Sequence, residues 1–177
     1  MAESNADARS AYIDVIPFAR HLGFEVVRYE AGDSELRWAP RAEHLNHLGM
    51  AHGGACMTML DIAMAAAARS EALDMAVVTI EMKTTFMRPS RGPLVARGRL
   101  LHRTRSMAFV EATIFDGQDH ACAHSTGTFK FVPRPVPGGD VASNDQVTER
   151  STAHAPAAPP VAPPASSTAA AATSGRD

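Results

Sequence analysis

The sequence predicts a small α+β domain in which one long helix lies against an antiparallel sheet of five or six strands. The first observation is a helical pattern over residues 55–72 that is almost entirely apolar. The second is a set of strand-like runs, separated by Gly, Pro and Asp, at residues 23–31, 33–39, 76–87, 94–102, 107–116 and 121–132. One long helix among such strands is typical of the α+β class.

Composition divides the chain into three parts. Residues 1–10 are polar and acidic, and we expect them to be disordered. Residues 11–132 carry the periodic pattern of a folded domain, with a short helical segment over 11–21 that Pro17 should interrupt. From residue 133 the chain is rich in Pro and Ala, and residues 151–177 include ten Ala and five Pro. A segment with so few core-forming side chains predicts a disordered tail over 133–177.

The bulk numbers exclude several functional classes. The formal net charge of −2 gives no basic field for nucleic acid or an anionic membrane. Two cysteines, Cys56 and Cys122, make neither a disulfide framework nor a zinc ligand set, so we expect no metal. The polar N-terminus is unlike a secretory signal, and no apolar run reaches the roughly 20 residues that a membrane helix needs. These features favour a cytoplasmic protein.

Asp61 is the sharpest candidate for chemistry. Between residues 55 and 68 the only polar side chains are Thr58 and Asp61. A helix that is apolar on all sides should be buried on all sides, which requires a curved sheet and a partner subunit to cover it. A carboxylate there must be paired, hydrogen-bonded or placed in a wet cleft. The alternative is that this face of the helix is simply exposed to solvent.

Two further features accompany Asp61. His52-Gly53-Gly54 precedes the helix, and its glycines would let a ligand approach the free N–H groups of the first turn. Such donors can polarise a carbonyl and stabilise an oxyanion. Thr79 lies in the strand that follows; strict alternation groups it with Glu81, Lys83 and Thr85, opposite Val78, Ile80, Met82 and Phe86. Thr79 is either a strand former or a hydrogen-bond partner for a water or for Asp61.

The spacing of these residues resembles a known family. Asn46-His47-Leu48-Gly49-Met50-Ala51-His52-Gly53-Gly54, followed eight residues after Gly53 by Asp61, is similar to the N-x-x-G-x-x-H-G-G pattern and acidic residue of hotdog-fold acyl-CoA thioesterases of the phenylacetate-pathway type. Thr79 matches a Ser/Thr position of that family, and Phe86-Met87-Arg88-Pro89 is similar to its strand end. The resemblance covers about residues 17–132.

The resemblance implies a hotdog fold and hydrolysis of an acyl-CoA thioester, without a cofactor. Family members are dimers or tetramers whose sheets join edge to edge and share each active site. The resemblance implies that Asn46 and the Gly53 amide of one subunit bind the thioester carbonyl. Asp61 of the other subunit would be the base or nucleophile, with Thr79 placing a water and His52 beside the site. No nucleic acid or membrane partner is implied.

Substrate contacts are less sharply indicated. Gly54 and Met57 lie next to the predicted carbonyl site, so both are candidates for substrate binding. Coenzyme A carries phosphates, for which arginine is well suited. Arg88, Arg91 and Arg103 are therefore candidate CoA contacts, because they fall near strand ends and turns. Neither the acyl group nor the choice between CoA and acyl carrier protein can be derived from the sequence.

Other interpretations remain open at this stage. Cys56 lies in the first helical turn, where a thiolate nucleophile would be stabilised and His52 could act as its base. Residues 123–127 resemble a degraded nucleophile elbow, although a strand rather than a helix follows them. A hotdog hydratase or dehydratase, or a non-catalytic acyl-CoA-binding domain, could retain the same residues.

Overall fold

The computed structural model describes residues 16–134. The predicted disorder of residues 1–10 and of the tail beyond Arg134 lies outside the described residues. The elements, in chain order, are α2 (Pro17–Leu22), β1 (Glu25–Glu30), β2 (Asp33–Trp38), the 3-10 helix η1 (Ala42–His44), α3 (Gly53–Arg69), β3 (Met75–Phe86), β4 (Leu94–Arg103), β5 (Met107–Phe115) and β6 (Ala121–Pro133). β6 ends at Pro133, which pairs with Met75, so this residue belongs to the sheet and not to the predicted tail.

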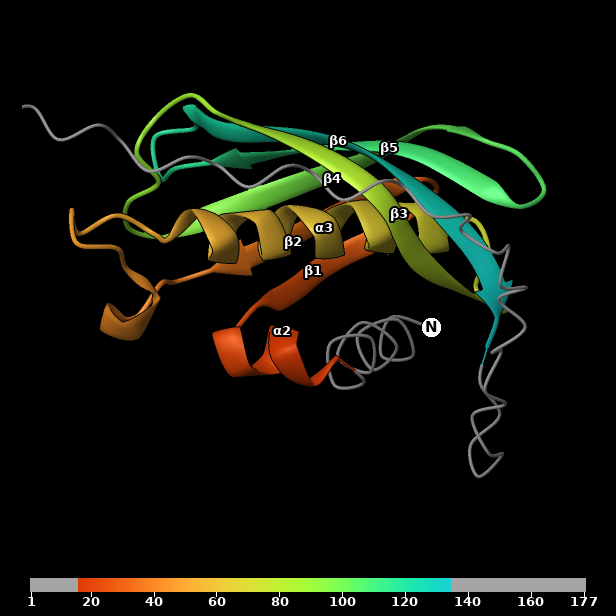
Figure 1. Ribbon diagram of the computed structural model, residues 1–177, viewed down its shortest axis with the longest axis horizontal. Helices are drawn as coiled ribbons and strands as arrows, with labels where there is room; N and C mark the ends of the chain where they lie inside the picture. Colours follow the sequence, from red (N-terminus) through yellow and green to blue (C-terminus); the bar gives the residue numbers. More distant parts are fainter. Residues whose placement is uncertain (1–15, 135–177) are drawn as a thin grey trace, which may run out of the picture. The chain divides into compact units, whose positions relative to one another are not determined.

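The six strands form one sheet with the order β1-β2-β4-β5-β6-β3, and every neighbouring pair is antiparallel. Figure 1 shows this sheet curving over α3, which runs along its concave side. The predicted α+β architecture of one long helix and an antiparallel sheet is confirmed. β1 and β3 are the two edge strands of this sheet within residues 16–134.

Identifiable residues set the starts of α2 and α3 and the end of α3. α2 starts at Pro17, because proline lacks an N–H and is favoured in the first turn, and Ile16 before it is not helical, in agreement with the expected break at Pro17. α3 starts at Gly53 rather than at residue 55, because the His52 side chain caps it. At its other end the Ser70 hydroxyl donates to the Ala67 carbonyl at 2.7 Å and accepts from the Gly32 N–H at 2.8 Å. These bonds tie the end of α3 to the β1–β2 hairpin.

The buried face of α3 packs very closely on the sheet. Small side chains at Ala63, Ala66 and Ala67 are fully buried there. Gly98 of β4 permits the approach, because a Cβ at this position would lie 2.6 Å from the Ala63 carbonyl oxygen and 2.5 Å from Ser34 Oγ. Ser34 Oγ in turn donates to that carbonyl at 2.7 Å. The level of the helix above the sheet is therefore set by a glycine and a buried hydroxyl.

The opposite face of α3 is only partly covered by residues 16–134, so the expected burial on all sides would need the partner subunit. Its incompletely buried residues are spaced three or four apart and include Gly54, Met57, Thr58, Asp61 and Ala65. Met57 is 37% exposed. One chain therefore leaves an open stripe along α3, beside the sheet edge formed by β3. Among the described residues, no helix is long and apolar enough to cross a membrane.

Replacing Gly98 with alanine tests this packing. Since the added methyl group would meet backbone and a hydrogen-bonded hydroxyl, we expect Gly98→Ala to lower the free energy of unfolding by about 2–3 kcal/mol. Gly117→Ala is the matched control, because a Cβ there has no heavy atom within 4 Å. Urea denaturation measures both variants. Equal stability of the two would contradict this account of how α3 sits on β4.

Candidate active site

The N-terminus of α3 presents a backbone donor to a pocket. His52 Nδ1 accepts the N–H of Gly54 at 3.0 Å, which satisfies that donor. The Gly53 N–H, at the first helical position, makes no hydrogen bond within residues 16–134 and borders a pocket. His52 therefore lies beside the predicted site as the helix cap. Gly54, predicted to contact substrate, has its N–H bonded to that cap.

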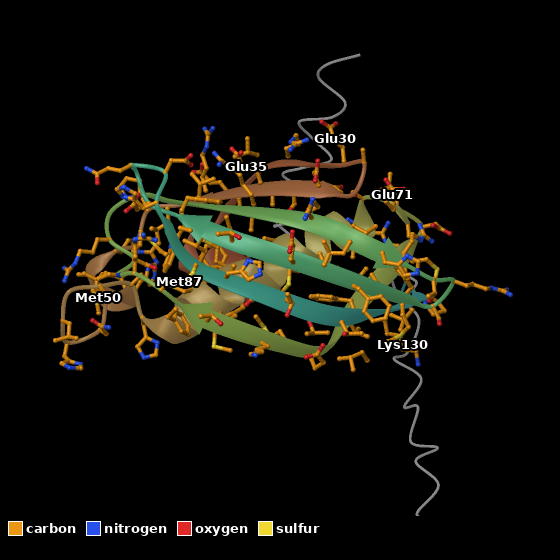
Figure 2. All side chains as sticks on the ribbon, turned by 90° about the horizontal axis from the view of Figure 1, so that it is seen from above. Glu30, Glu35, Met50, Glu71, Met87 and Lys130 are labelled. Carbon is orange, nitrogen blue, oxygen red and sulfur yellow. The ribbon has the colours of Figure 1, made fainter. Side chains whose placement is uncertain are left out.

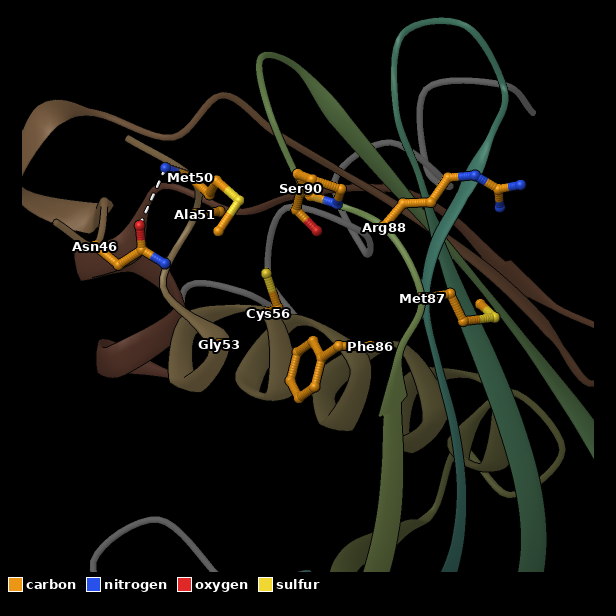
Figure 3. A pocket seen from close by; sticks show the side chains of 10 residues that line it. Asn46, Met50, Ala51, Gly53, Cys56, Phe86, Met87, Arg88 and Ser90 are labelled. Carbon is orange, nitrogen blue, oxygen red and sulfur yellow. Dashed lines mark hydrogen bonds between the residues drawn. The ribbon is translucent and has the colours of Figure 1, made fainter. Parts of the chain in front are cut away.

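The Asn46 side chain supplies a second donor. Its Oδ1 accepts the N–H of Leu48 at 2.9 Å and the N–H of Met50 at 3.2 Å. These two bonds fix the orientation of the carboxamide, so its Nδ2 is turned away from the loop. Figure 3 shows the oxygen on the side of Met50 and the nitrogen on the side of the chain that leads to Gly53. The sequence prediction that Asn46 and Gly53 lie at one site is consistent with this arrangement.

Both donors line the same pocket, which has a volume of about 370 Å³. Its walls are largely apolar and come from the residue 46–56 segment and from the end of β3 with the turn after it (Figure 3). A Cβ at Gly53 would lie 3.4 Å from Cζ of Phe86, so a larger residue there would fill the space between helix and ring. The lining residues are Asn46, Met50, Ala51, Gly53, Cys56, Phe86, Met87, Arg88, Pro89 and Ser90.

Asp61 lies on the open stripe of α3, not in this pocket. Thr79 Oγ1 donates to Asp61 Oδ1 at 2.7 Å, which confirms the carboxylate as the partner of Thr79. Burial raises the pKa of the Asp61 carboxyl above its ordinary value, and the hydrogen bond from Thr79 partly offsets the rise. The carboxylate is thus held in place and made more basic than an exposed aspartate.

A β-bulge in β3 brings Thr79 to this position. Thr79 pairs with Phe129 and Glu81 with Thr128, so Ile80 is the extra residue. The bulge overturns the predicted alternation. Thr79 lies on the inner face of the sheet with Met82 and Phe86. The outer face carries Val78, Glu81, Lys83 and Thr85. Without the extra residue, Thr79 and Phe86, seven positions apart, would lie on opposite faces.

Asp61 and Gly53 of one chain are too far apart to act on the same carbonyl. Both lie on α3, eight residues apart. A helix rises about 1.5 Å per residue, which puts them about 12 Å apart along the axis. Within one chain the structure thus forms two separate groups: Asn46 with Gly53 at the pocket, and Asp61 with Thr79 on the open stripe.

The predicted arginine and methionine contacts are distributed over the whole domain. Arg88 borders the pocket and donates to the Ala121 carbonyl at 3.0 Å. Arg91 donates to the carbonyls of Leu48 and Gly49. Arg103 donates to the Glu71 carbonyl and lies over the Phe131 ring. Figure 2 shows Glu71 at the opposite end of the molecule from Met50 and Met87. Met57 projects from the open stripe and does not line the pocket.

Two alternative nucleophiles lose support. Burial raises the pKa of the Cys56 thiol, which outweighs a hydrogen bond with Ser90 and favours the protonated form. Ser125 of the suspected nucleophile elbow lies within β6, is fully buried and hydrogen-bonds to Thr84. Within residues 16–134, no three His, Cys, Asp or Glu side chains converge as a metal site would require. The pocket residues Met50, Ala51, Pro89 and Ser90 were not among the predicted site residues, although the first three lie within the segments that resemble the family.

Comparison with known proteins places this fold and site in a family. Residues 48–123 match the model of the thioesterase superfamily. A conserved protein from Pseudomonas aeruginosa is 31% identical with a TM-score of 0.63, covering 65% of this chain and 93% of its own. The chain belongs to the thioesterase superfamily and has its hotdog fold.

Two further relatives agree with this assignment. The protein named "Putative esterase Ta0293" from Thermoplasma acidophilum is 29% identical over 114 residues, which are 63% of this chain and 86% of the relative. The PaaI protein from the phenylacetic acid degradation operon of E. coli shares the fold with a TM-score of 0.66 at 21% identity, over 73% of this chain and 94% of its own.

The raised pKa of Asp61 has a consequence for stability. In the unfolded chain the carboxyl titrates near its ordinary value, about 3.9. As pH rises through the interval between that value and the higher folded pKa, the unfolded chain loses its proton first, and the folded state loses stability. An asparagine side chain at this position does not titrate. We therefore expect Asp61→Asn to be more stable than the wild type at pH 7–8, with the difference shrinking as pH falls below the folded pKa and disappearing near the unfolded value of about 3.9.

Asp116 provides a control of opposite sign. Hydrogen bonds from the His120 and Gln118 backbone N–H groups lower the pKa of its carboxyl. Asp116→Asn should therefore be less stable than the wild type at neutral pH. Urea titrations of both variants between pH 3 and 8 measure these differences. A wild type more stable at pH 7 than Asp61→Asn would contradict the assignment of a destabilised carboxylate.

Proposed function

We propose that the protein is an acyl-CoA thioesterase, which hydrolyses a thioester to a free acid and CoA. The observation that carries the proposal is a pair of donors at one apolar pocket, Gly53 N–H and Asn46 Nδ2, which have no hydrogen-bond partner within residues 16–134. Family membership supports hydrolysis of an ester or thioester. A protein from Streptococcus mutans with this fold (23% identity, TM-score 0.59, 64% of this chain and 92% of its own) was solved bound to acetyl CoA, which supports the CoA ester as substrate.

The two donors would bind the thioester carbonyl oxygen. When a nucleophile adds to the carbonyl carbon, negative charge develops on this oxygen, and donors already fixed by the protein need no reorganisation to stabilise it. One such donor contributes about 3–4 kcal/mol to the transition state. The positive end of α3 lies behind Gly53 and acts in the same direction.

Asp61 of a partner subunit would complete the site. About 12 Å separates Gly53 and Asp61 along α3, so a second copy must provide the carboxylate. The sheet edge at β3 favours pairing with that copy, because Val78, Ile80 and Phe86 are 44%, 55% and 50% exposed beside open backbone groups. Antiparallel pairing of two β3 strands would run the Phe86 end of one past the Thr79 end of the other.

Two chemical routes fit this geometry. As a base, Asp61 would take a proton from a water held with Thr79, and the hydroxide would attack the carbonyl. As a nucleophile, its carboxylate would attack directly, expel the CoA thiolate and leave an anhydride for water to cleave. Hydrolysis in H₂¹⁸O under single-turnover conditions separates the routes, since only the second puts ¹⁸O into Asp61.

Thiol release from a panel of aryl, short-chain and long-chain acyl-CoAs tests the proposed reaction. We expect release above the uncatalysed rate from at least one class. A hydratase or dehydratase on this fold would change enoyl-CoA absorbance without releasing thiol, and a binding domain would do neither. Either of those outcomes would overturn the proposed function.

The Asp61→Asn variant tests the residue assignment. Asparagine has nearly the same shape and can still accept from Thr79, so the fold should be retained. Removing the base or nucleophile should lower kcat by at least about 100-fold. Asp116→Asn, outside the proposed site, controls for the loss of one carboxylate. Turnover near the wild-type value in a folded Asp61→Asn protein would exclude Asp61 from the reaction.

A further inference from the structure

Arg91, in the connection between β3 and β4, holds the loop that carries Asn46. Its Nη1 donates to the Gly49 carbonyl at 3.0 Å and its Nη2 to the Leu48 carbonyl at 3.2 Å. Arg91 is not among the residues that line the pocket, although Arg88, Pro89 and Ser90 before it are. Its contacts are therefore with the outside of the loop.

Both peptide groups that Arg91 holds also donate to Asn46, one to its backbone oxygen and one to its side chain. The Leu48–Gly49 peptide gives its carbonyl to Arg91 and its N–H to the Asn46 backbone oxygen, at 3.0 Å. The Gly49–Met50 peptide gives its carbonyl to Arg91 and its N–H to Asn46 Oδ1, at 3.2 Å. Gly49 has a φ of +66°, a left-handed conformation that glycine adopts without steric cost and that directs both carbonyls of this turn to Arg91.

We infer that Arg91 is a positioning residue, which orients the Asn46 carboxamide toward the substrate carbonyl through these two peptide groups. This inference rests on the proposed thioesterase function and replaces a role for Arg91 in binding CoA phosphate. The planar guanidinium donates to both carbonyls at once, which a lysine ammonium cannot do with the same geometry. Its charge also polarises both peptides, so their N–H groups bind Asn46 more strongly.

The positioning role and a phosphate contact predict different kinetics. Misplacing Asn46 Nδ2 weakens a contact that matters most in the transition state, so kcat should fall while KM changes little. The loss should be equal for an acyl-CoA and for the matching acyl-pantetheine, which lacks the nucleotide and its phosphates. A phosphate contact would instead raise KM for acyl-CoA and leave acyl-pantetheine unaffected.

The experiment compares Arg91→Met, Arg91→Lys and the surface control Arg20→Met on both substrates. We expect Arg91→Met to lower kcat about 10- to 100-fold on each, because small misplacements in an active site have effects of this size. Arg91→Lys should be intermediate, millimolar guanidinium should partly restore Arg91→Met, and Arg20→Met should match the wild type. A loss confined to the KM for acyl-CoA would overturn the inference.

A double-mutant cycle asks whether Arg91 acts through Asn46. Asn46→Asp keeps the acceptor Oδ1 and removes the donor. In the Asn46→Asp background, Arg91→Met should lower kcat by less than about twofold, since the donor that Arg91 positions is absent. Full additivity of the two losses would contradict the inference.

Amide hydrogen exchange provides a readout that does not depend on turnover. The Gly49 and Met50 amides should exchange faster in Arg91→Met than in the wild type, and unchanged protection would overturn the inference. A wild type that releases no thiol from either substrate would refute the proposed function, whereas the exchange result would still decide whether Arg91 holds the loop.

Discussion

The close contact between α3 and the inner face of β3 is the constraint on which both parts of the site depend. Phe86 of β3 must face inward to lie against Gly53, and Thr79 must face inward to hold Asp61. These residues are seven positions apart, so a regular strand would turn one of them outward. The bulge at Ile80 supplies the extra residue that lets both face the helix. It also keeps Glu81, Lys83 and Thr85 on the outer face, where a charge costs little.

The ends of α3 are stabilised by hydrogen bonds, whereas the middle of the helix carries one destabilising group, the Asp61 carboxylate. His52 and Ser70 satisfy backbone groups at the two ends of α3, and Gly98 sets its distance from the sheet. Asp61 is different, because burial disfavours its charged form and only Thr79 offsets that cost. A group that lowers stability, in a helix otherwise made of apolar residues, is expected of a functional site.

The sequence was sufficient to predict the helix and the strands, because periodicity is a local property, and it left Asp61 as one of several possible partners for Thr79. It was not sufficient to predict which residues of β3 face the helix and which face outward. Residues 78–81 alternate without interruption, and only the register against β6 reveals the bulge. Nor could it assign the arginines: Arg91 and Arg103 are far in sequence from the carbonyls that they bind. The Gly54 N–H was predicted to be free, and its bond to His52 depends on a side-chain rotamer.

Subunit complementation tests most directly whether two chains share each site. Asp61→Asn and Asn46→Asp, each expected to have about 1% or less of wild-type turnover alone, are mixed under conditions of subunit exchange, and exchange is confirmed by mass spectrometry. Random exchange makes half of the dimers mixed, and each mixed dimer has one site with both native groups. Activity should therefore return to roughly a quarter of the wild-type value, as expected for a two-fold symmetric pair with independent sites. No recovery despite complete exchange would contradict the shared site, because every single chain then carries a defect.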